Sequence, residues 1–330
     1  MTTTEPGTTL GGTLGKRVPR RIRQLSWRTW RGVVVRSVQN FVTDNCSDWA
    51  AALTYYGVLA LFPSAIVVVA LVGLVSNGEQ TVDTVVDLAR QLGAGAVVAD
   101  KGSETGVVGV IRSVVVEQGH AKVLLSFGLL GALWSASGFI GAFTRASNAI
   151  YGVTEGRPVW KLRPLQIGLA AITLVLLAVV ALGLIVSGPV TDAVGDLINA
   201  GGLARTVWSV AKWPVLALIM MVLLSLLFWI APNVRQPRFR WLTPGGAVAL
   251  FAWAVASFGF SLYVANFGSY GATYGSLGAA IAFLVWLYLS NSALMLGVQI
   301  NAEVQRGRRL QAGDPDPEEP VLPPRKPAGS

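Results

Sequence analysis

A small set of charged and amide side chains flanks the apolar segments of this sequence, and these groups could bind a ligand. Arg145, Asn148, Glu155 and Arg157 follow one apolar segment, and Glu303 follows another. Arginine and carboxylate groups can form an ion-pair clamp, in which Glu303 pairs with one of these arginines. They can equally bind the phosphate of a lipid headgroup, which accepts paired hydrogen bonds from guanidinium groups. The residue types leave both interpretations open.

Two amides and one proline lie inside apolar segments. Asn291 and Gln299 predict either hydrogen bonds between helices or the lining of a polar cavity, because polar groups inside membrane helices are costly unless they find a partner. Pro63 has no backbone N–H and is expected to kink the helix that contains it. Kinks of this kind border cavities or gates in some proteins and are ordinary features of membrane helices in others.

Residue counts give little support to an enzyme. The chain has one histidine, His120, and one cysteine, Cys46. A zinc site normally takes three or four Cys, His or carboxylate ligands, and no predicted cytoplasmic loop carries a pair of carboxylates with the metal-ligand spacing that two-metal nucleases need. The Gly-x-x-x-x-Gly-Lys-Ser/Thr phosphate-binding loop is also absent from the sequence. We therefore expect neither enzymatic activity nor a cofactor or metal.

The elements that position these residues follow from the distribution of charge. Of the 330 residues, 53% are hydrophobic and 13% are charged, about half the charged fraction of a soluble domain. Five stretches contain no Asp, Glu, Lys or Arg: 49–78, 123–144, 164–191, 213–234 and 241–302. About 20 apolar residues in a helix cross a bilayer, and the last stretch is broken by a turn at residues 266–275. The sequence thus predicts an all-α integral membrane protein with six transmembrane helices.

The predicted organisation has four parts. A basic, disordered N-terminus (1–23) precedes an amphipathic helix (24–45) that lies in the headgroup plane. A six-span membrane domain (46–304) has its spans at about 50–76, 123–144, 165–188, 213–231, 245–266 and 276–302. Residues 77–122 form a small helical insertion outside the cytoplasm, between the first two spans. The Pro-rich tail (305–330) is expected to be disordered.

The basic residues predict the orientation. Twenty of the 26 Lys and Arg residues lie in the N-terminal segment, in the loops after the second and fourth spans, and in the tail. The positive-inside rule then places both termini in the cytoplasm. The same distribution accounts for the net charge of +9 without nucleic acid, since basic cytoplasmic loops also attract anionic headgroups.

Several segments resemble the YihY/BrkB family of bacterial inner-membrane proteins. They occur in the family's order between about residues 40 and 305. They are Ala50-Ala-Ala-Leu-Thr-Tyr-Tyr56 with Leu61-Phe-Pro63, Trp134-Ser-Ala-Ser137, Asn148-Ala-Ile-Tyr-Gly152, Pro244-Gly-Gly246, Tyr274-Gly-Ser-Leu-Gly-Ala279, Trp286-Leu-Tyr-Leu289 and Ile300-Asn-Ala-Glu303. The resemblance implies a six-helix plan and a role in envelope integrity, with some members linked to export of lipid precursors. An older ribonuclease label also attaches to the family. Gln299 departs from the family, whose members tend to carry an acidic residue there.

Three hypotheses of function follow. The preferred one is a non-enzymatic, multi-pass protein of the bacterial plasma membrane that supports envelope integrity by transporting or flipping a lipid or lipid-linked precursor. Its partners would be membrane lipids, with no nucleic acid. The alternative is a membrane scaffold that binds partner proteins through residues 77–122. Ribonuclease activity is the third, and the composition disfavours it. The sequence does not define an oligomeric state.

Overall fold

The computed structural model describes residues 24–75, 118–185, 201–236, 239–266, 270–313 and 321–328. Within these ranges the regular structure is helical, apart from an isolated β-bridge between Val234 and Pro324. The helices are α1 (Trp27–Thr43), α2 (Cys46–Val75), α6 (Gln118–Ile150), α7 (Val159–Ile185), α9 (Gly201–Ile230), α10 (Pro244–Asn266) and α11 (Tyr270–Gln311). The predicted all-α class is therefore confirmed for the described residues.

Each of the six predicted apolar segments coincides with one long helix, from α2 to α11. Four of these helices are long and apolar enough to cross a membrane, over Val159–Val180, Val210–Ile230, Pro244–Val264 and Ala280–Gln311. The predicted N-terminus (1–23) and residues 77–117 of the predicted insertion lie outside the described residues, whereas 118–122 belong to α6.

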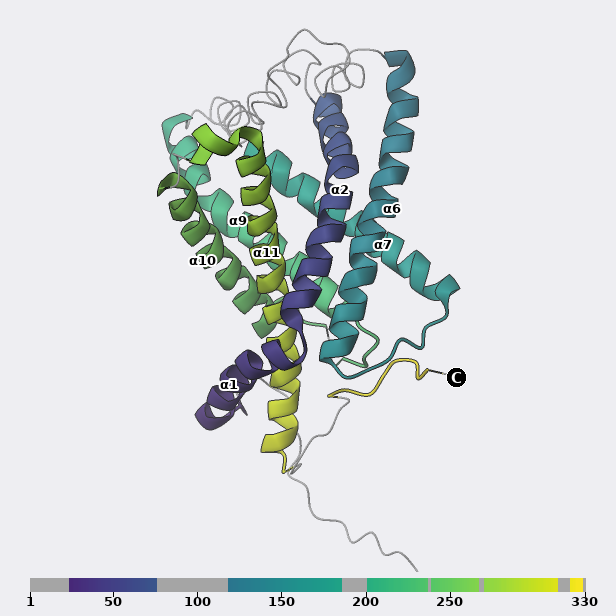
Figure 1. Cartoon of the computed structure of the whole chain (residues 1–330), viewed down its shortest axis with the longest axis vertical. Coiled ribbons are helices and arrows are strands. Elements are labelled where there is room, and N and C mark those ends of the chain that lie inside the picture. The colour runs from purple at the N-terminus through teal and green to yellow at the C-terminus, as the bar shows by residue number, and fades with distance from the viewer. Residues whose placement is uncertain are drawn as a thin grey trace, which may run out of the picture.

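The six long helices form a ring in which each packs against its neighbour in the order α2, α6, α7, α9, α10, α11, and α11 packs against α2 to close it. In Figure 1, α2 and α6 stand together on one side, with α10 and α11 on the other. The largest buried side chains include Leu53, Phe143, Tyr151 and Met295. These belong to the half of the bundle next to α1, so the packed core lies there. We call this end of the ring the α1 end.

Two glycines set the crossing of α10 over α11. A Cβ atom added at Gly297 would lie 2.8 Å from the Cβ of Ala249 and 2.9 Å from the Cζ of Phe228, and one added at Gly245 would meet the carbonyl oxygen of Gly297. Small residues let membrane helices approach closely enough for backbone contact. The Pro244-Gly-Gly246 segment therefore begins α10 directly against α11.

Helix α1 lies across the lower part of α11 (Figure 1). Its N-cap is Ser26, whose side chain accepts a hydrogen bond from the N–H of Thr29. After α1, Asn45 adopts a φ of 50° that turns the chain into α2. Val33 is buried, as is Ser37. A helix is thus present within the predicted range 24–45, and its place in the headgroup plane stays a prediction. Three of its large apolar side chains are exposed, namely Trp27, Val34 and Val38.

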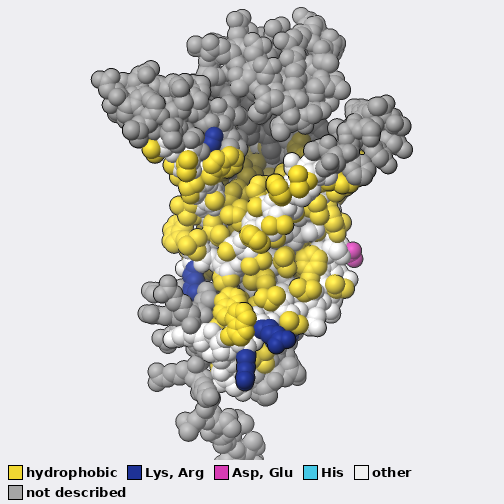
Figure 2. Space-filling view, turned by 90° about the vertical axis from the view of Figure 1, so that its left-hand side faces the viewer, with side chains coloured by type: hydrophobic (Ala, Val, Ile, Leu, Met, Phe, Trp, Pro, Cys, Tyr) yellow, Lys and Arg dark blue, Asp and Glu magenta, His cyan; other side chains and the backbone are white. Residues whose placement is uncertain are grey.

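The outer surface of the ring is apolar. Hydrophobic side chains cover the middle of the face shown in Figure 2, and the Lys and Arg side chains lie mostly toward its lower edge, with one near its upper edge. Helix α10 contributes Phe251 and Phe258, which are 71% and 68% exposed. Only 6% of the residues in the most apolar stretch of α10 are buried inside the protein. Such a surface is too apolar for water and matches the hydrocarbon of a bilayer.

The C-terminal residues differ from the flexible end that was expected from residue 305 onward. Helix α11 continues to Gln311, and residues 321–328 pack against the bundle with Val321 only 1% exposed. The N–H of Val321 donates to the carbonyl oxygen of Tyr151. Proline richness made this segment look unstructured, but proline forbids only regular helix and sheet, and an extended segment can still be held by specific contacts.

Candidate functional site

Glu303 is the centre of a clamp between α1 and α11. Its carboxylate is 1% exposed and accepts hydrogen bonds from Arg36 Nε at 2.7 Å and Asn40 Nδ2 at 2.9 Å. Arg306 Nε lies 3.3 Å from the same carboxylate. We call these four residues the Glu303 clamp. The prediction that Glu303 pairs with Arg145 or Arg157 is therefore wrong, because the amphipathic helix supplies the arginine instead.

The two amides inside α11 bond to neighbouring elements. Asn291 Nδ2 donates to Thr54 Oγ1 of α2 at 3.1 Å. Gln299 Nε2 donates to Asp44 Oδ2 at 3.0 Å, at the turn between α1 and α2. Cys46 Sγ lies 3.8 Å from Gln299 Oε1. Of the two interpretations of Asn291 and Gln299, these contacts correspond to hydrogen bonding between helices, and neither residue is among those lining the pocket described below.

Asn148, Glu155 and Arg157 come together as predicted. Arg157 donates through Nε and Nη2 to the two oxygens of Glu155 at 2.8 and 2.7 Å, and Asn148 Nδ2 donates to Glu155 Oε2 at 3.0 Å. Burial acts to raise the pKa of the Glu155 carboxyl, but the hydrogen bonds and charge of Arg157 outweigh it and hold that pKa below its ordinary range. Arg157 Nη2 also donates to the carbonyl oxygen of Ala231, which ties the α6–α7 connection to the end of α9.

The C-terminal segment completes this second cluster. Arg325 Nε donates to the carbonyl oxygen of Val234 at 2.9 Å, and its guanidinium carbon lies 5.3 Å from the centre of the Trp229 ring. Burial, and then the nearby charge of Arg157, lower the pKa of Arg325. Gly156 must be glycine here, since a Cβ would meet the backbone of the segment at Lys326. Nothing in the sequence indicated this docking.

Arg145 takes no part in either cluster. Its side chain is exposed and its guanidinium carbon lies 5.8 Å from the centre of the Tyr56 ring, a cation–π arrangement between α6 and α2. Pro63 lies inside α2, where its ring leaves the carbonyl of Leu59 without its helical N–H donor. A Cβ at Gly131 of α6 would lie 4.0 Å from Pro63. Kinking at Pro63 stays a prediction.

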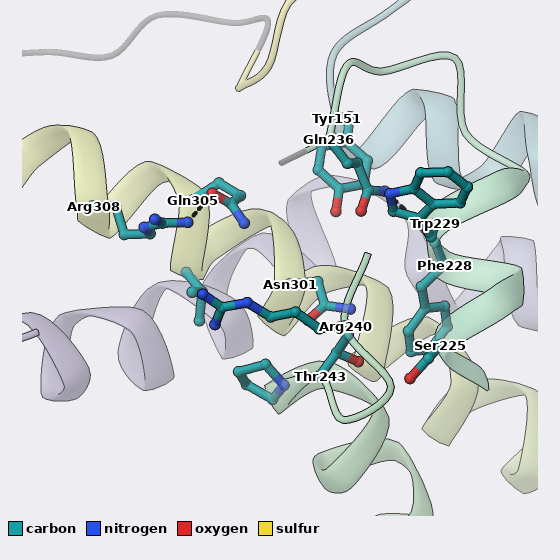
Figure 3. A pocket seen from close by; sticks show the side chains of 12 residues that line it. Tyr151, Ser225, Phe228, Trp229, Gln236, Arg240, Thr243, Asn301, Gln305 and Arg308 are labelled. Carbon is teal, nitrogen blue, oxygen red and sulfur yellow. Dashed lines mark hydrogen bonds between the residues drawn. The ribbon is translucent and has the colours of Figure 1, made fainter. Parts of the chain in front are cut away.

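A pocket of about 50 Å³ opens at the α1 end between α9, α10 and α11 (Figure 3). Its lining combines two arginines, three amides and three hydroxyl groups with apolar side chains. The lining residues are Tyr151, Ser225, Phe228, Trp229, Gln236, Arg240, Thr243, Pro244, Asn301, Val304, Gln305 and Arg308. We call this the inner pocket. The sequence did not single it out, because Arg240 and Arg308 counted only toward topology.

Hydrogen bonds fix the walls of the inner pocket. Asn301 Oδ1 accepts from the N–H of Gly245 at 2.9 Å, at the start of α10. Arg308 Nη1 donates to Gln305 Oε1 at 3.0 Å, one turn apart on α11 (Figure 3). Ser225 Oγ donates to the carbonyl oxygen of Trp241. The polar lining is thus held by backbone and side-chain contacts from three helices, which makes it a preformed site.

Metal chemistry has no candidate in the part of the chain that is described. Within those ranges, no three His, Cys, Asp or Glu side chains lie together so that they could hold a metal ion. Cys46 is buried as a free thiol. The chemistry that the described residues offer is therefore ion pairing, hydrogen bonding and anion binding through arginine.

Four helices are long and apolar enough to cross a membrane, and the polar clusters lie at the α1 end of the bundle. This arrangement defines a helical membrane protein. The chain belongs to the Virulence factor BrkB family, whose model matches residues 37–322. A relative in Bacillus subtilis (strain 168), the ribonuclease-like protein YfkH, is 33% identical over 193 residues, which make up 58% of this chain and 70% of that protein. No solved structure matches the chain. The resemblance inferred from the sequence motifs is confirmed.

Proposed function

We propose that this protein is a six-span protein of the bacterial plasma membrane that supports envelope integrity by moving a lipid or lipid-linked precursor, without enzymatic activity. The observation that carries the proposal is the inner pocket. It is a polar, arginine-containing site walled by three helices whose other surfaces are apolar. A lipid presents the same combination, with a polar head on apolar tails.

The proposed orientation has the α1 end and both termini in the cytoplasm. The charge distribution supports it, because the loops after α6 and α9 and the end of α11 carry the basic residues. Helix α1 would then lie in the headgroup plane, with exposed Trp27 and Val38 facing the lipid. Helices α2 and α6 would cross the membrane beside the four helices of sufficient length and apolarity. Labelling of single cysteines placed at the termini of a Cys46→Ala variant, in inside-out and right-side-out vesicles, tests this orientation.

The first test of the function is mass spectrometry of lipids retained after gentle extraction of the protein from its own membrane. We expect one lipid or lipid-linked sugar to be enriched well above its bulk abundance. That lipid is then followed in proteoliposomes, where the protein should accelerate its exchange between leaflets relative to protein-free liposomes. Retention that mirrors the bulk membrane, together with unchanged exchange, would contradict the proposal.

Two alternatives make different predictions. A scaffold acting through residues 77–122, nearly all of which lie outside the described ranges, should crosslink to a defined partner protein through that region and lose function when the region is deleted. Ribonuclease activity is favoured by the name of the relative YfkH. It requires RNA cleavage that copurifies with the protein and disappears in a point variant. Lipid exchange without RNA cleavage supports the proposal over both.

A further inference from the structure

The inner pocket differs from the other polar clusters of the α1 end in its charge. Among the twelve described residues that line it, two are charged, Arg240 and Arg308, and none is acidic. Arg308 is 8% exposed. Arg240 is exposed at the mouth of the pocket. Two guanidinium groups beside one cavity suit an anion, because charged donors form strong, paired hydrogen bonds with phosphate oxygens.

The remaining lining strengthens this preference. Thr243 Oγ1 accepts from the N–H of Gly246, so that α10 begins at the pocket wall with its N-terminus. Helix N-termini carry partial positive charge and favour anions. Asn301 and Gln305 add side-chain amides, which can donate to phosphate oxygens as well as accept. The described lining residues therefore offer several hydrogen-bond donors and no acidic group.

The neighbourhood of the pocket places it near the level of lipid headgroups. Trp241, directly after Arg240, is 63% exposed, and Leu242 beside it is also 63% exposed. Two further tryptophans at this end, Trp27 and Trp160, are 81% and 77% exposed. Exposed tryptophans of membrane proteins concentrate at the boundary between headgroups and hydrocarbon. An arginine pocket beside this belt lies where lipid phosphates lie.

We infer that the inner pocket is a binding site for a phosphate-type anion, in which Arg308 and Arg240 hold the phosphate oxygens and Asn301 and Gln305 contribute amide hydrogen bonds. The inference deepens the proposed function, because it assigns the polar group of the transported molecule to one chemical class. A lipid headgroup and a free phosphate ion present the same chemistry to these side chains.

Binding to the purified full-length chain tests the inference. Inorganic phosphate is titrated against the detergent-solubilised protein by calorimetry, and nanodiscs of phosphatidylglycerol or of phosphatidylcholine measure lipid binding. We expect the Arg240→Gln, Arg308→Gln double variant to lose at least tenfold in affinity for the anion. Arg163→Gln, which removes an exposed charge from the start of α7 outside the pocket, should leave that affinity within about twofold.

A second variant guards against misfolding of the first. Gln305→Glu supplies a carboxylate next to Arg308, so the protein should fold at least as well while the added carboxylate competes with the anion. We expect the same loss of binding with an unchanged thermal transition. If Arg163→Gln weakened anion binding as much, the loss would reflect the overall surface charge and not the pocket, which would overturn the inference. Absence of saturable binding of either ligand to the unaltered chain would overturn it as well.

The outcomes of the binding and lipid-exchange measurements also distinguish this inference from the proposed function. Pocket-dependent binding of phosphatidylglycerol that inorganic phosphate displaces supports both, with the lipid headgroup as the ligand. Pocket-dependent binding of inorganic phosphate alone supports the anion site with a soluble ligand and counts against lipid movement. Accelerated lipid exchange that survives the double variant supports the proposed function and overturns a role for this pocket in it.

Discussion

Helix α11 presents two polar faces around residue 303, and each uses arginine differently. Residues 301, 304, 305 and 308 share one face, because a helix turns by 100° per residue, and Glu303 points to the opposite side. Toward α1, the carboxylate of Glu303 receives Arg36 and lies near Arg306. Toward α9 and α10, Arg308 meets Arg240 around a pocket without a described acidic lining residue. A carboxylate held between two arginines indicates a structural joint, whereas two arginines that line a cavity indicate a ligand site.

The largest expected effect comes from destroying the crossing that forms the pocket face. Gly245→Ala places a Cβ against the backbone of Gly297, which cannot move aside as a flexible side chain can. We expect a loss of about 3 kcal/mol in unfolding free energy, at the upper end of overpacking costs. Thermal unfolding in detergent, followed by circular dichroism, measures it. Gly259→Ala on the same helix meets nothing within 4 Å and is the matched control; equal transitions for the two variants would contradict the close crossing.

Breaking the Glu303 clamp should lower the unfolding free energy by less than Gly245→Ala does. Glu303→Gln removes the negative charge between Arg36 and Arg306. Breaking a buried pair costs about 3–5 kcal/mol, but these arginine side chains are 29% and 21% exposed and recover part of their hydration, so we expect about 2 kcal/mol. Limited proteolysis should also show α1 released from α11.

Arg306→Gln provides the internal comparison for that variant, since its 3.3 Å contact is the longer of the two ion pairs. It should lower the thermal transition less than Glu303→Gln does. The reverse order would mean that Arg306, and not the link to α1, dominates the clamp.

The Glu155 cluster offers a pH-dependent test of pairing. Because the pKa of Glu155 is lowered in the folded protein, its stabilisation is complete above the unfolded value of about 4.3 and is lost as the pH falls through the folded value. Glu155→Gln should therefore lower stability by about 1 kcal/mol at pH 7, after allowance for solvent screening. Thermal transitions measured from pH 7 downward should converge for the two proteins at acidic pH. A difference that stays constant with pH would exclude the charge as its cause.

The smallest expected effect on stability comes from Arg240→Gln at the inner pocket. Arg240 is exposed, and exposed substitutions usually change stability by less than about 0.5 kcal/mol. Arg240→Gln should unfold like the unaltered protein while it weakens anion binding. A stability loss as large as that of Glu303→Gln would show that both faces of α11 are structural joints and would remove the contrast between them.

The sequence was informative about helices and poor about their contacts. Charge-free stretches located the six long helices, because hydrocarbon excludes charge over a fixed length, and that rule is local in the sequence. The pairing of Glu303 was mispredicted because its partner, Arg36, lies 267 residues away. Only the closure of the ring brings α1 beside α11, and a single sequence does not specify that closure.

The site was predicted in part for a similar reason. Asn148, Glu155 and Arg157 are close in sequence and were correctly grouped, whereas Arg145 was grouped with them and points to Tyr56 instead. The inner pocket was missed because its two arginines resembled topology-determining charges. One signal was available: Asn301 is a polar residue inside the charge-free stretch, next to Glu303 and on the opposite face of the helix.

The contact of α1 with α11 has a consequence for biogenesis. Ribosomes deliver the N-terminal helix first and the last span at the end of synthesis. The contacts of Val33, Arg36 and Asn40 with α11 therefore form only after the intervening chain has been synthesised and inserted. Gln311 Nε2, which donates to the carbonyl oxygen of Gln24, joins the two ends in the same late step. Docking of α1 can thus distinguish a full-length chain from a truncated one. A chain truncated before residue 303 leaves α1 undocked and exposed to the cell's proteases.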